Sequence, residues 1–324
     1  MSETLIEVKE VSKTFSNKAV FGKKKENQVL QKVSVTVLKN ETLALVGESG
    51  CGKTTLGRIM LGLEDATEGT VAFEGQNLFA GKKIRKDIRR KMQMVFQDPF
   101  ASLDPKMKIE DSLMEPLEAN RIGKNKAERR EMAKKLLESV GLNETHMKRY
   151  PHEFSGGQRQ RIGIARALAP EPSFVVCDEP VSALDVSVQA QILNLLKEIQ
   201  RNREMSMLFI SHDLGVVRYI ADRVVIMYLG RICEIGEVED VYNHPKHPYT
   251  EYLIQSVPKM RIPKYREENE KKEVKRASEA TESAQKAGCP FYTRCKYRTE
   301  KCSREYPEKQ ENGERLFYCH HPLA

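Results

Sequence analysis

No stretch of this 324-residue sequence approaches the about 18 consecutive apolar residues that a membrane-spanning helix needs. Residues 1–4 also lack the basic start and apolar core of a secretory signal. Sustained apolar heptads are missing as well, which argues against a long coiled coil. We therefore expect a globular chain on the cytosolic side of a membrane, whose membrane role, if it has one, depends on a partner.

Cysteine is scarce before residue 289, which argues against a framework of disulfides. Cys177 and Cys233 lie in apolar segments, where we expect them to pack as small hydrophobic residues. Cys51 is the third scattered cysteine, and the other four gather in the last 36 residues, as Cys289, Cys295, Cys302 and Cys319. Four thiolates suit an iron–sulfur cluster or tetrahedral zinc, and unligated thiols are the third possibility. The absence of a Cys-x-x-Cys pair argues against an ordinary zinc ribbon, whereas His320 and His321 keep zinc open.

The formal net charge is +8, and much of the excess is local. Seven basic residues lie within Lys82–Lys91, and Lys23, Lys24 and Lys25 form a second block. A nucleic-acid surface usually interleaves such charges with aromatic rings for stacking, and the first block has none. We therefore expect solvated faces, some near anionic lipid headgroups, and no nucleic-acid partner.

The segment Gly47–Thr54 fits the phosphate-binding loop G-x-x-x-x-G-K-[ST] without a mismatch. An apolar run, Thr42–Val46, precedes it as a predicted strand, and Thr55–Leu61 follows as the start of a helix. Glycines let the backbone wrap a polyphosphate, and the N–H groups at the helix start face its anionic oxygens. Lys53 would reach the β- and γ-phosphates, and Thr54 would offer its hydroxyl to Mg²⁺. The pattern predicts binding of a nucleoside triphosphate.

Short apolar runs alternate with segments of helical period, which predicts an α/β fold with a largely parallel sheet. Between residues 98 and 169 the pattern is almost entirely helical and indicates an inserted helical subdomain. Residues 259–288 are charged and poor in large apolar side chains, and we expect a linker there. The predicted organisation is a nucleotide-binding domain over 1–258, this linker, and a small metal-binding tail over 289–324. The predicted strands are Val33–Val37, Thr42–Val46, Met92–Phe96, Phe174–Cys177, Met207–Ile210 and Val224–Met227.

Two further motifs carry chemistry. The strand at Phe174–Cys177 ends in Asp178, placed to hold Mg²⁺, and Glu179, placed to polarise an attacking water. Upstream, Ser155-Gly156-Gly157-Gln158 precedes a helix expected from about Arg159 to Ala169. Ser155 can cap this helix while the two glycines leave backbone N–H groups facing an anion.

With the phosphate loop, these motifs resemble the nucleotide-binding subunit of ABC (ATP-binding cassette) transporters. The resemblance covers roughly residues 5–240 and includes Gln97, the loop Ser182–Asp185 and His212. It implies a RecA-like P-loop NTPase core, an antiparallel β region, a helical subdomain, and hydrolysis of ATP with Mg²⁺. It also implies that two such subunits sandwich each ATP, so that Ser155–Gln158 of one completes the site of the other.

Carried over residue by residue, the resemblance implies catalytic roles for Glu179, His212 and Gln97. It implies Mg²⁺ ligation by Thr54, Gln97 and Asp178. The adenine ring would stack on Phe15, with Phe21 as the alternative because residues 16–28 blur the alignment. The implied nucleotide-binding residues are Phe15, Gly47, Ser49, Gly50, Cys51, Gly52, Lys53, Thr54, Thr55, Gln97, Asp178, Ser155, Gly156, Gly157 and Gln158.

His247–Thr250 and the four tail cysteines resemble the C-terminal extension of oligopeptide and dipeptide importers, with nickel and glutathione importers close by. Residues 97–105 and 179–185 are more similar to the F-type ATPase subunit than to its D-type partner. The resemblance implies a D-type ATPase partner, two permease subunits, an extracytoplasmic binding protein, a [4Fe–4S] cluster, and a peripheral position on the cytoplasmic face of the membrane.

Two other classes fit less well. Ribosome-acting and DNA-repair ABC proteins carry two cassettes or a long coiled coil, and this chain has one phosphate loop and no heptads. A GTP switch would use an Asn-Lys-x-Asp base reader, and the nearest string, Asn125–Glu128, lacks the aspartate.

Overall fold

The computed structural model describes residues 3–17, 25–79, 85–98, 102–256 and 288–324. The predicted linker over 259–288 lies outside these residues except for Gly288, and so do Phe21 and parts of both basic blocks. In the described part of the Lys82–Lys91 block, Arg85 pairs with Asp87 and Lys91 with Glu74, as expected of a solvated face. No helix within the described ranges combines the length and apolar character needed to cross a membrane.

Eight strands form the central sheet, in the order β11-β12-β10-β9-β3-β8-β7-β6. Strand β3 pairs in parallel with β8 and β9, and β7 pairs in parallel with β8 and β6. The parallel strands are buried on both faces, which is why their sequences are continuous apolar runs. Their bounds are β3 Thr42–Val46, β6 Met92–Val95, β7 Phe174–Asp178, β8 Ser206–Ser211 and β9 Arg223–Tyr228.

The remaining strands pair in antiparallel fashion. Strand β10 pairs with β9 and with β12, and β12 pairs with β11, so the C-terminal tail extends the central sheet. A second, four-stranded sheet has the order β2-β1-β4-β5. The predicted strand Val33–Val37 is part of β2 in this sheet. The bounds are β1 Thr4–Asn17, β2 Lys25–Leu38, β4 Glu68–Phe73, β5 Gln76–Asn77, β10 Arg231–Glu237, β11 Gln310–Asn312 and β12 Arg315–Phe317.

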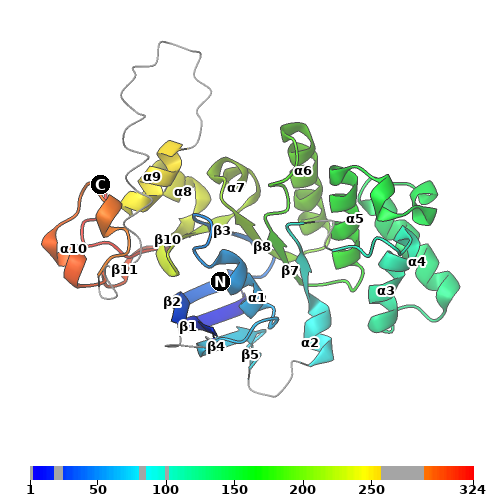
Figure 1. The fold of residues 1–324 in the computed structure, drawn as a ribbon, viewed down its shortest axis with the longest axis horizontal. Helices are drawn as coiled ribbons and strands as arrows, with labels where there is room; N and C mark the ends of the chain where they lie inside the picture. The colour runs from blue at the N-terminus through cyan, green and yellow to red at the C-terminus, as the bar shows by residue number, and fades with distance from the viewer. Residues whose placement is uncertain (1–2, 18–24, 80–84, 99–101, 257–287) are drawn as a thin grey trace, which may run out of the picture.

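Helices divide between two hydrophobic cores. One core lies between the small sheet, α1, α2 and one face of the central sheet, and the other packs α3–α9 on the opposite face. Figure 1 shows helices α3–α5 at one end of the molecule and the cysteine-rich tail at the other. The bounds are α1 Lys53–Met60, α2 Lys86–Lys91, α3 Ile109–Ala119, α4 Lys126–Ser139, α5 Gly156–Leu168, α6 Val186–Asn202, α7 Leu214–Ile220, α8 Val238–Asn243, α9 Pro248–Ser256 and α10 Glu300–Arg304, with short 3₁₀ turns at Glu144–Lys148, Pro151–Glu153 and Tyr292–Arg294 (η5).

The sequence predicted the parallel strands correctly, and several element boundaries were wrong by one or more residues. Helix α5 begins at Gly156 rather than near Arg159, because Ser155 caps the helix directly and the residues after it form the first turn. Strand β6 ends at Val95, one residue before the predicted end at Phe96, which is partly exposed.

Candidate nucleotide site

The phosphate loop connects β3 to α1, as its flanking sequence predicted. Lys53 is buried, and its Nζ donates to the carbonyl oxygens of Gly47 at 2.7 Å and Glu48 at 3.0 Å. The ammonium group therefore lies inside the curve of the loop, where it can pass from these carbonyls to the oxygens of a phosphate.

Glycine is required at two positions of this loop. A Cβ on Gly47 would lie 2.2 Å from the carbonyl oxygen of Met227. Gly52 has φ +102°, a left-handed conformation that L-residues rarely adopt, and directly precedes α1. Both glycines therefore keep the loop close to its neighbours and direct the helix start toward the nucleotide site.

Two of the three predicted Mg²⁺ ligands, Thr54 and Asp178, are in contact. Thr54 Oγ1 donates to Asp178 Oδ1 at 3.0 Å, which joins the first turn of α1 to the end of β7. Asp178 is buried, and burial raises its pKa, against the hydrogen bond from Thr54 that lowers it. A hydroxyl and a carboxylate are hard oxygen donors, so the set fits a divalent cation such as Mg²⁺.

Glu179 follows β7 and meets two residues that the sequence also singled out. Its Oε2 lies 3.2 Å from Nε2 of Gln97 and 3.5 Å from Nδ1 of His212. The backbone of Glu179 has φ +43°, an unusual conformation for a residue with a Cβ. Backbone strain of this kind concentrates at functional sites, where the surrounding structure holds it. Here the N–H of Glu179 donates to the carbonyl of Ile210 at 3.0 Å.

A cavity of about 580 Å³ joins these groups. It opens beside the phosphate loop and is lined by Val29, Glu48, Ser49, Gly50, Gly52, Lys53, Thr54, Thr55, Gln97, Glu179 and His212. The predicted general base Glu179, the phosphate loop, and Thr54, which bonds the predicted Mg²⁺ ligand Asp178, thus line one cavity. Val29 and the side chain of Glu48 were not among the predicted site residues, because neither carries a chemical signature of its own.

Several of the predicted nucleotide-binding residues do not line this cavity. Cys51 is buried beneath the loop, so only its backbone is available, and burial raises the pKa of its thiol. Phe15 is partly exposed and does not line the cavity; Nζ of Lys13 lies 4.8 Å from its ring centre. Ser155, Gly156, Gly157 and Gln158 also lie outside the cavity lining, at the start of α5.

The turn at Ser155 is a reciprocal cap. The N–H of Gln158 donates to Ser155 Oγ at 3.4 Å, and the N–H of Ser155 donates to Gln158 Oε1 at 3.1 Å. In the nearby loop, Asp185 caps α6 by accepting from the N–H of Val188 at 3.0 Å. A Cβ on Gly157 would lie 2.4 Å from Val188 Cγ1, so the two helix starts pack closely.

The four tail cysteines line one small cavity of about 20 Å³, together with apolar and aromatic side chains such as Phe291 and Pro307. All four are free thiols. Burial raises the pKa of Cys289 to about 11 and that of Cys319 to about 12. In the described part of the chain, no three His, Cys, Asp or Glu side chains are arranged to hold a single metal ion.

The two histidines that kept zinc open are engaged elsewhere through one ring nitrogen each. Nε2 of His321 lies 2.9 Å from Thr299 Oγ1, and Nε2 of His320 lies 3.1 Å from the carbonyl oxygen of Glu305. Both histidines also line the cysteine cavity, as does His247, and Cys302 and Cys319 have polar contacts of their own with Thr299 Oγ1 and the N–H of His321. The donor set around the cavity is therefore four thiols with imidazole rings beside them, which suits an iron–sulfur cluster or zinc.

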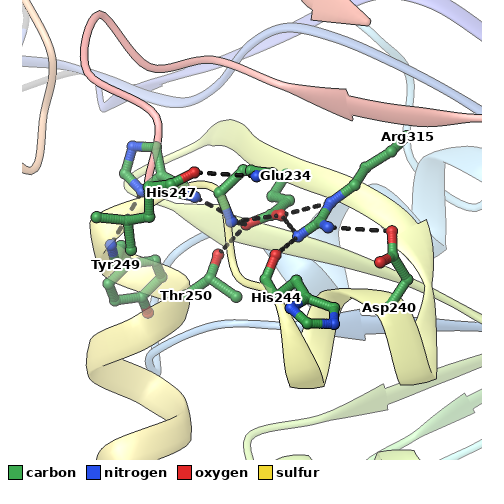
Figure 2. A network of polar contacts seen from close by, with 9 residues as sticks. Glu234, Asp240, His244, His247, Tyr249, Thr250 and Arg315 are labelled. Carbon is green, nitrogen blue, oxygen red and sulfur yellow. Dashed lines mark hydrogen bonds and ion pairs between the residues drawn. The ribbon is translucent and has the colours of Figure 1, made fainter. Parts of the chain in front are cut away.

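The tail docks on the core through a buried ion pair, shown in Figure 2. Nε of Arg315, on β12, lies 2.9 Å from Glu234 Oε1 on β10, and its Nη1 lies 3.0 Å from Asp240 Oδ2. Glu234 is fully buried and also accepts from Thr250 Oγ1 at 2.7 Å and from the N–H of His247 at 3.0 Å. The same carboxylate therefore holds the tail and the start of α9.

Comparisons with known proteins match the core and the C-terminal region separately. Residues 30–182 match a family model described as "ABC transporter", and residues 233–302 match "Oligopeptide/dipeptide transporter, C-terminal region". The chain is 49% identical over 261 residues to oligopeptide transport ATP-binding protein OppF of Bacillus subtilis, covering 80% of this chain and 84% of that protein. It is 44% identical to AppF, an oligopeptide transport ATP-binding protein of the same organism, covering 98% and 97%.

Among solved structures, the ATP-binding cassette MJ0796, a dimer in a post-hydrolysis state bound to ADP and Pi, matches with a TM-score of 0.64. The match has 29% identity and covers 72% of this chain and 99% of that one.

Proposed function

The chain belongs to the family of ABC transporter ATP-binding proteins, in the branch with oligopeptide and dipeptide transporters, and we propose that it hydrolyses ATP to power peptide import through a membrane permease. The observation that carries this proposal is the shared cavity of the phosphate loop, Glu179 and His212. It places a polyphosphate-binding loop beside a carboxylate at the end of a parallel strand, where α/β folds bind ligands.

Each residue of the cavity has a proposed role. Lys53 and the loop N–H groups bind the β- and γ-phosphates, and Thr54 and Asp178 hold Mg²⁺, which neutralises charge on the phosphates. Glu179 orients and deprotonates the attacking water, and His212, 3.5 Å away, holds that water and the γ-phosphate. Gln97 contacts Glu179 at 3.2 Å and so reports the state of the site to the helical subdomain.

A second subunit completes the site in this proposal. The turn Ser155–Gln158 forms the N-terminus of α5, whose N–H groups suit an anion. This turn does not line the nucleotide cavity of its own chain. A head-to-tail pair would bring this turn of one subunit against the γ-phosphate bound by the other. From the F-type resemblance, the proposed partner is a D-type ATPase subunit. Because each site needs residues of two subunits, an isolated monomer should be a poor ATPase.

The permease is proposed to dock between the core and the helical subdomain. A cavity of about 310 Å³ lies there, between β6, α3 and α5, and Gln93, Glu115, Asn120 and Arg166 line it. Gln160 also lines it; its Nε2 is buried and has no hydrogen-bond partner among the described residues. A cytoplasmic helix of the permease could supply that partner, which would hold this subunit at the cytoplasmic face of the membrane.

For the tail, the proposed group is a [4Fe–4S] cluster held by Cys289, Cys295, Cys302 and Cys319. Support comes from the four free thiols that line one cavity. The cluster would cross-link the tail, which is too small to fold unaided. No electron-transfer step follows from this arrangement.

Reconstituted transport tests the function. Vesicles would hold this chain, its co-purifying ATPase partner, the permease and the extracytoplasmic binding protein, with ATP enclosed on the cytoplasmic side. We expect uptake of labelled peptide that stops when the chain carries Lys53→Ala. Uptake of nickel or glutathione but not of peptide would assign the chain to those importers. ATP hydrolysis that supports no transport would favour a non-transport ABC ATPase.

A further inference from the structure

One residue of the tail reaches the phosphate loop. Nη1 of Arg294 lies 2.8 Å from Oε1 and 2.9 Å from Oε2 of Glu48, the second residue of the loop. Glu48 in turn lines the nucleotide cavity. Arg294 ends the 3₁₀ turn η5, and the next residue, Cys295, lines the cysteine cavity. This ion pair therefore links a segment beside the cysteine cavity to the wall of the nucleotide cavity.

Aromatic rings fix the guanidinium group. Its central carbon lies 4.7 Å from the ring centre of Tyr252, 5.7 Å from that of Phe291 and 5.8 Å from that of Tyr228. Nη1 also donates to the hydroxyl of Tyr228 at 3.4 Å. Cation–π contacts and buried rings restrict the directions in which the arginine can point. The guanidinium group is thus held toward Glu48 by residues of β9, α9 and the tail.

The backbone of Glu48 is held as well. Its N–H donates to the hydroxyl of the buried Tyr249 at 3.0 Å, and its carbonyl accepts from Lys53 Nζ at 3.0 Å. Tyr249 is anchored because its own N–H donates to Nδ1 of His247 at 3.0 Å. Figure 2 shows that this segment, His247–Thr250, belongs to the network around Glu234 and Arg315. Tail and α9 thus hold the same loop residue from two directions.

The charge of Glu48 creates a difficulty that Arg294 resolves. A carboxylate on the wall of a cavity that receives a triphosphate repels the ligand, and the guanidinium group, which contacts both carboxylate oxygens through Nη1, neutralises this charge and fixes its direction. We propose that Arg294 is a positioning residue for ATP, which acts through Glu48 to keep the phosphate loop open and free of uncompensated negative charge. The tail is thereby a working part of the nucleotide site.

Equilibrium binding of a slowly hydrolysed ATP analogue with Mg²⁺ to the full-length chain tests this role. We expect Arg294→Ala to raise Kd roughly three- to tenfold, the range for losing a partly exposed ion pair beside an anion. Arg294→Lys keeps the charge but loses the planar guanidinium group that packs against the aromatic rings, so its Kd should lie between those of the wild type and Arg294→Ala. The deficit should shrink at high salt, because added ions screen the repulsion.

A double variant separates charge from structure. If Arg294 acts through Glu48, then Arg294→Ala combined with Glu48→Gln restores Kd to within about twofold of the wild type. The matched control is Arg298→Ala, another tail arginine, which stacks on Tyr292 and donates to the carbonyl of Thr293 at a distance from the loop. Its Kd should equal that of the wild type.

Two results would overturn the inference. One is an unchanged Kd for Arg294→Ala; the other is a loss that the double variant does not restore, which would mean that the tail had merely been displaced. The inference rests on the proposed nucleotide site, and Lys53→Ala distinguishes the two failures. If Lys53→Ala abolishes binding while Arg294→Ala has no effect, only the role of Arg294 is wrong.

Discussion

Gln97 and Glu179 are 82 positions apart in the chain, yet Nε2 of Gln97 lies 3.2 Å from Oε2 of Glu179. The two residues follow β6 and β7, which are parallel neighbours, so the sheet itself brings the ends of both strands together. His212 follows β8, the next strand, and approaches the same oxygen at 3.5 Å. The proposed base is therefore positioned by three consecutive strands, and its geometry depends on the sheet rather than on loop contacts.

The first prediction concerns the role of Glu179 as a general base. Glu179→Gln keeps the shape of the side chain but cannot accept a proton, so turnover should fall by at least about 100-fold while ATP binding changes less than about twofold. Phosphate release and equilibrium nucleotide binding measure the two quantities. Glu198→Gln, an exposed change on α6, is the matched control. Near-normal turnover in Glu179→Gln would remove this residue from the mechanism.

A second prediction concerns Mg²⁺. Asp178→Asn removes the negative charge of the carboxylate that accepts from Thr54, so the Mg²⁺ concentration for half-maximal hydrolysis should rise about 10- to 100-fold. A Mg²⁺ titration of the ATPase rate measures this shift. Binding of ATP without Mg²⁺ should not weaken, and the exposed Asp65→Asn should behave as the wild type. Equal losses with and without Mg²⁺ would argue that Asp178 supports the loop and not the cation.

The part of the site built on the parallel strands could be predicted from the sequence. A strand buried on both faces is a continuous apolar run, and a polar residue directly after it lies at the ligand-binding edge. This signal marks Asp178, Glu179 and His212, and the phosphate-loop pattern marks Thr54. Their spatial proximity then follows from the order of the strands.

The contacts of the tail could not be predicted in the same way. Arg294 and Glu48 are separated by 246 positions, and Arg315 and Glu234 by 81. An arginine that pairs with a distant carboxylate has no periodic neighbours, and in sequence it is indistinguishable from a solvated charge. Strands β11 and β12 have three residues each, too few for an alternating pattern. Only the cysteine cluster marked this segment as ordered.

A third prediction tests how the tail is attached. Arg315→Ala leaves Glu234 buried without its charge partner, so the free energy of unfolding should fall by about 3–5 kcal/mol. Urea unfolding followed by far-UV circular dichroism measures the loss. Arg304→Ala breaks an exposed pair with Glu300 in the same tail and should cost less than about 0.5 kcal/mol.

The ion pair itself need not be a net source of stability. Replacing both partners, as Arg315→Met with Glu234→Gln, removes the buried charges together and should recover most of the loss seen in Arg315→Ala. If Arg315→Ala is no less stable than Arg304→Ala, the buried ion pair does not anchor the tail.

The last prediction concerns the group held by the tail. Chain purified without oxygen should be brown and contain about four irons, since four cysteines ligate one [4Fe–4S] cluster. Cys302→Ala removes one of the four cavity thiols and should lower the iron content, whereas Cys177→Ala, in the core strand β7, should leave it unchanged. Burial raises the pKa values of Cys289 and Cys319 to about 11 and about 12, so cluster assembly must displace protons and should slow as pH falls. Stoichiometric zinc without iron, or equal iron in Cys302→Ala and the unaltered chain, would contradict the assignment.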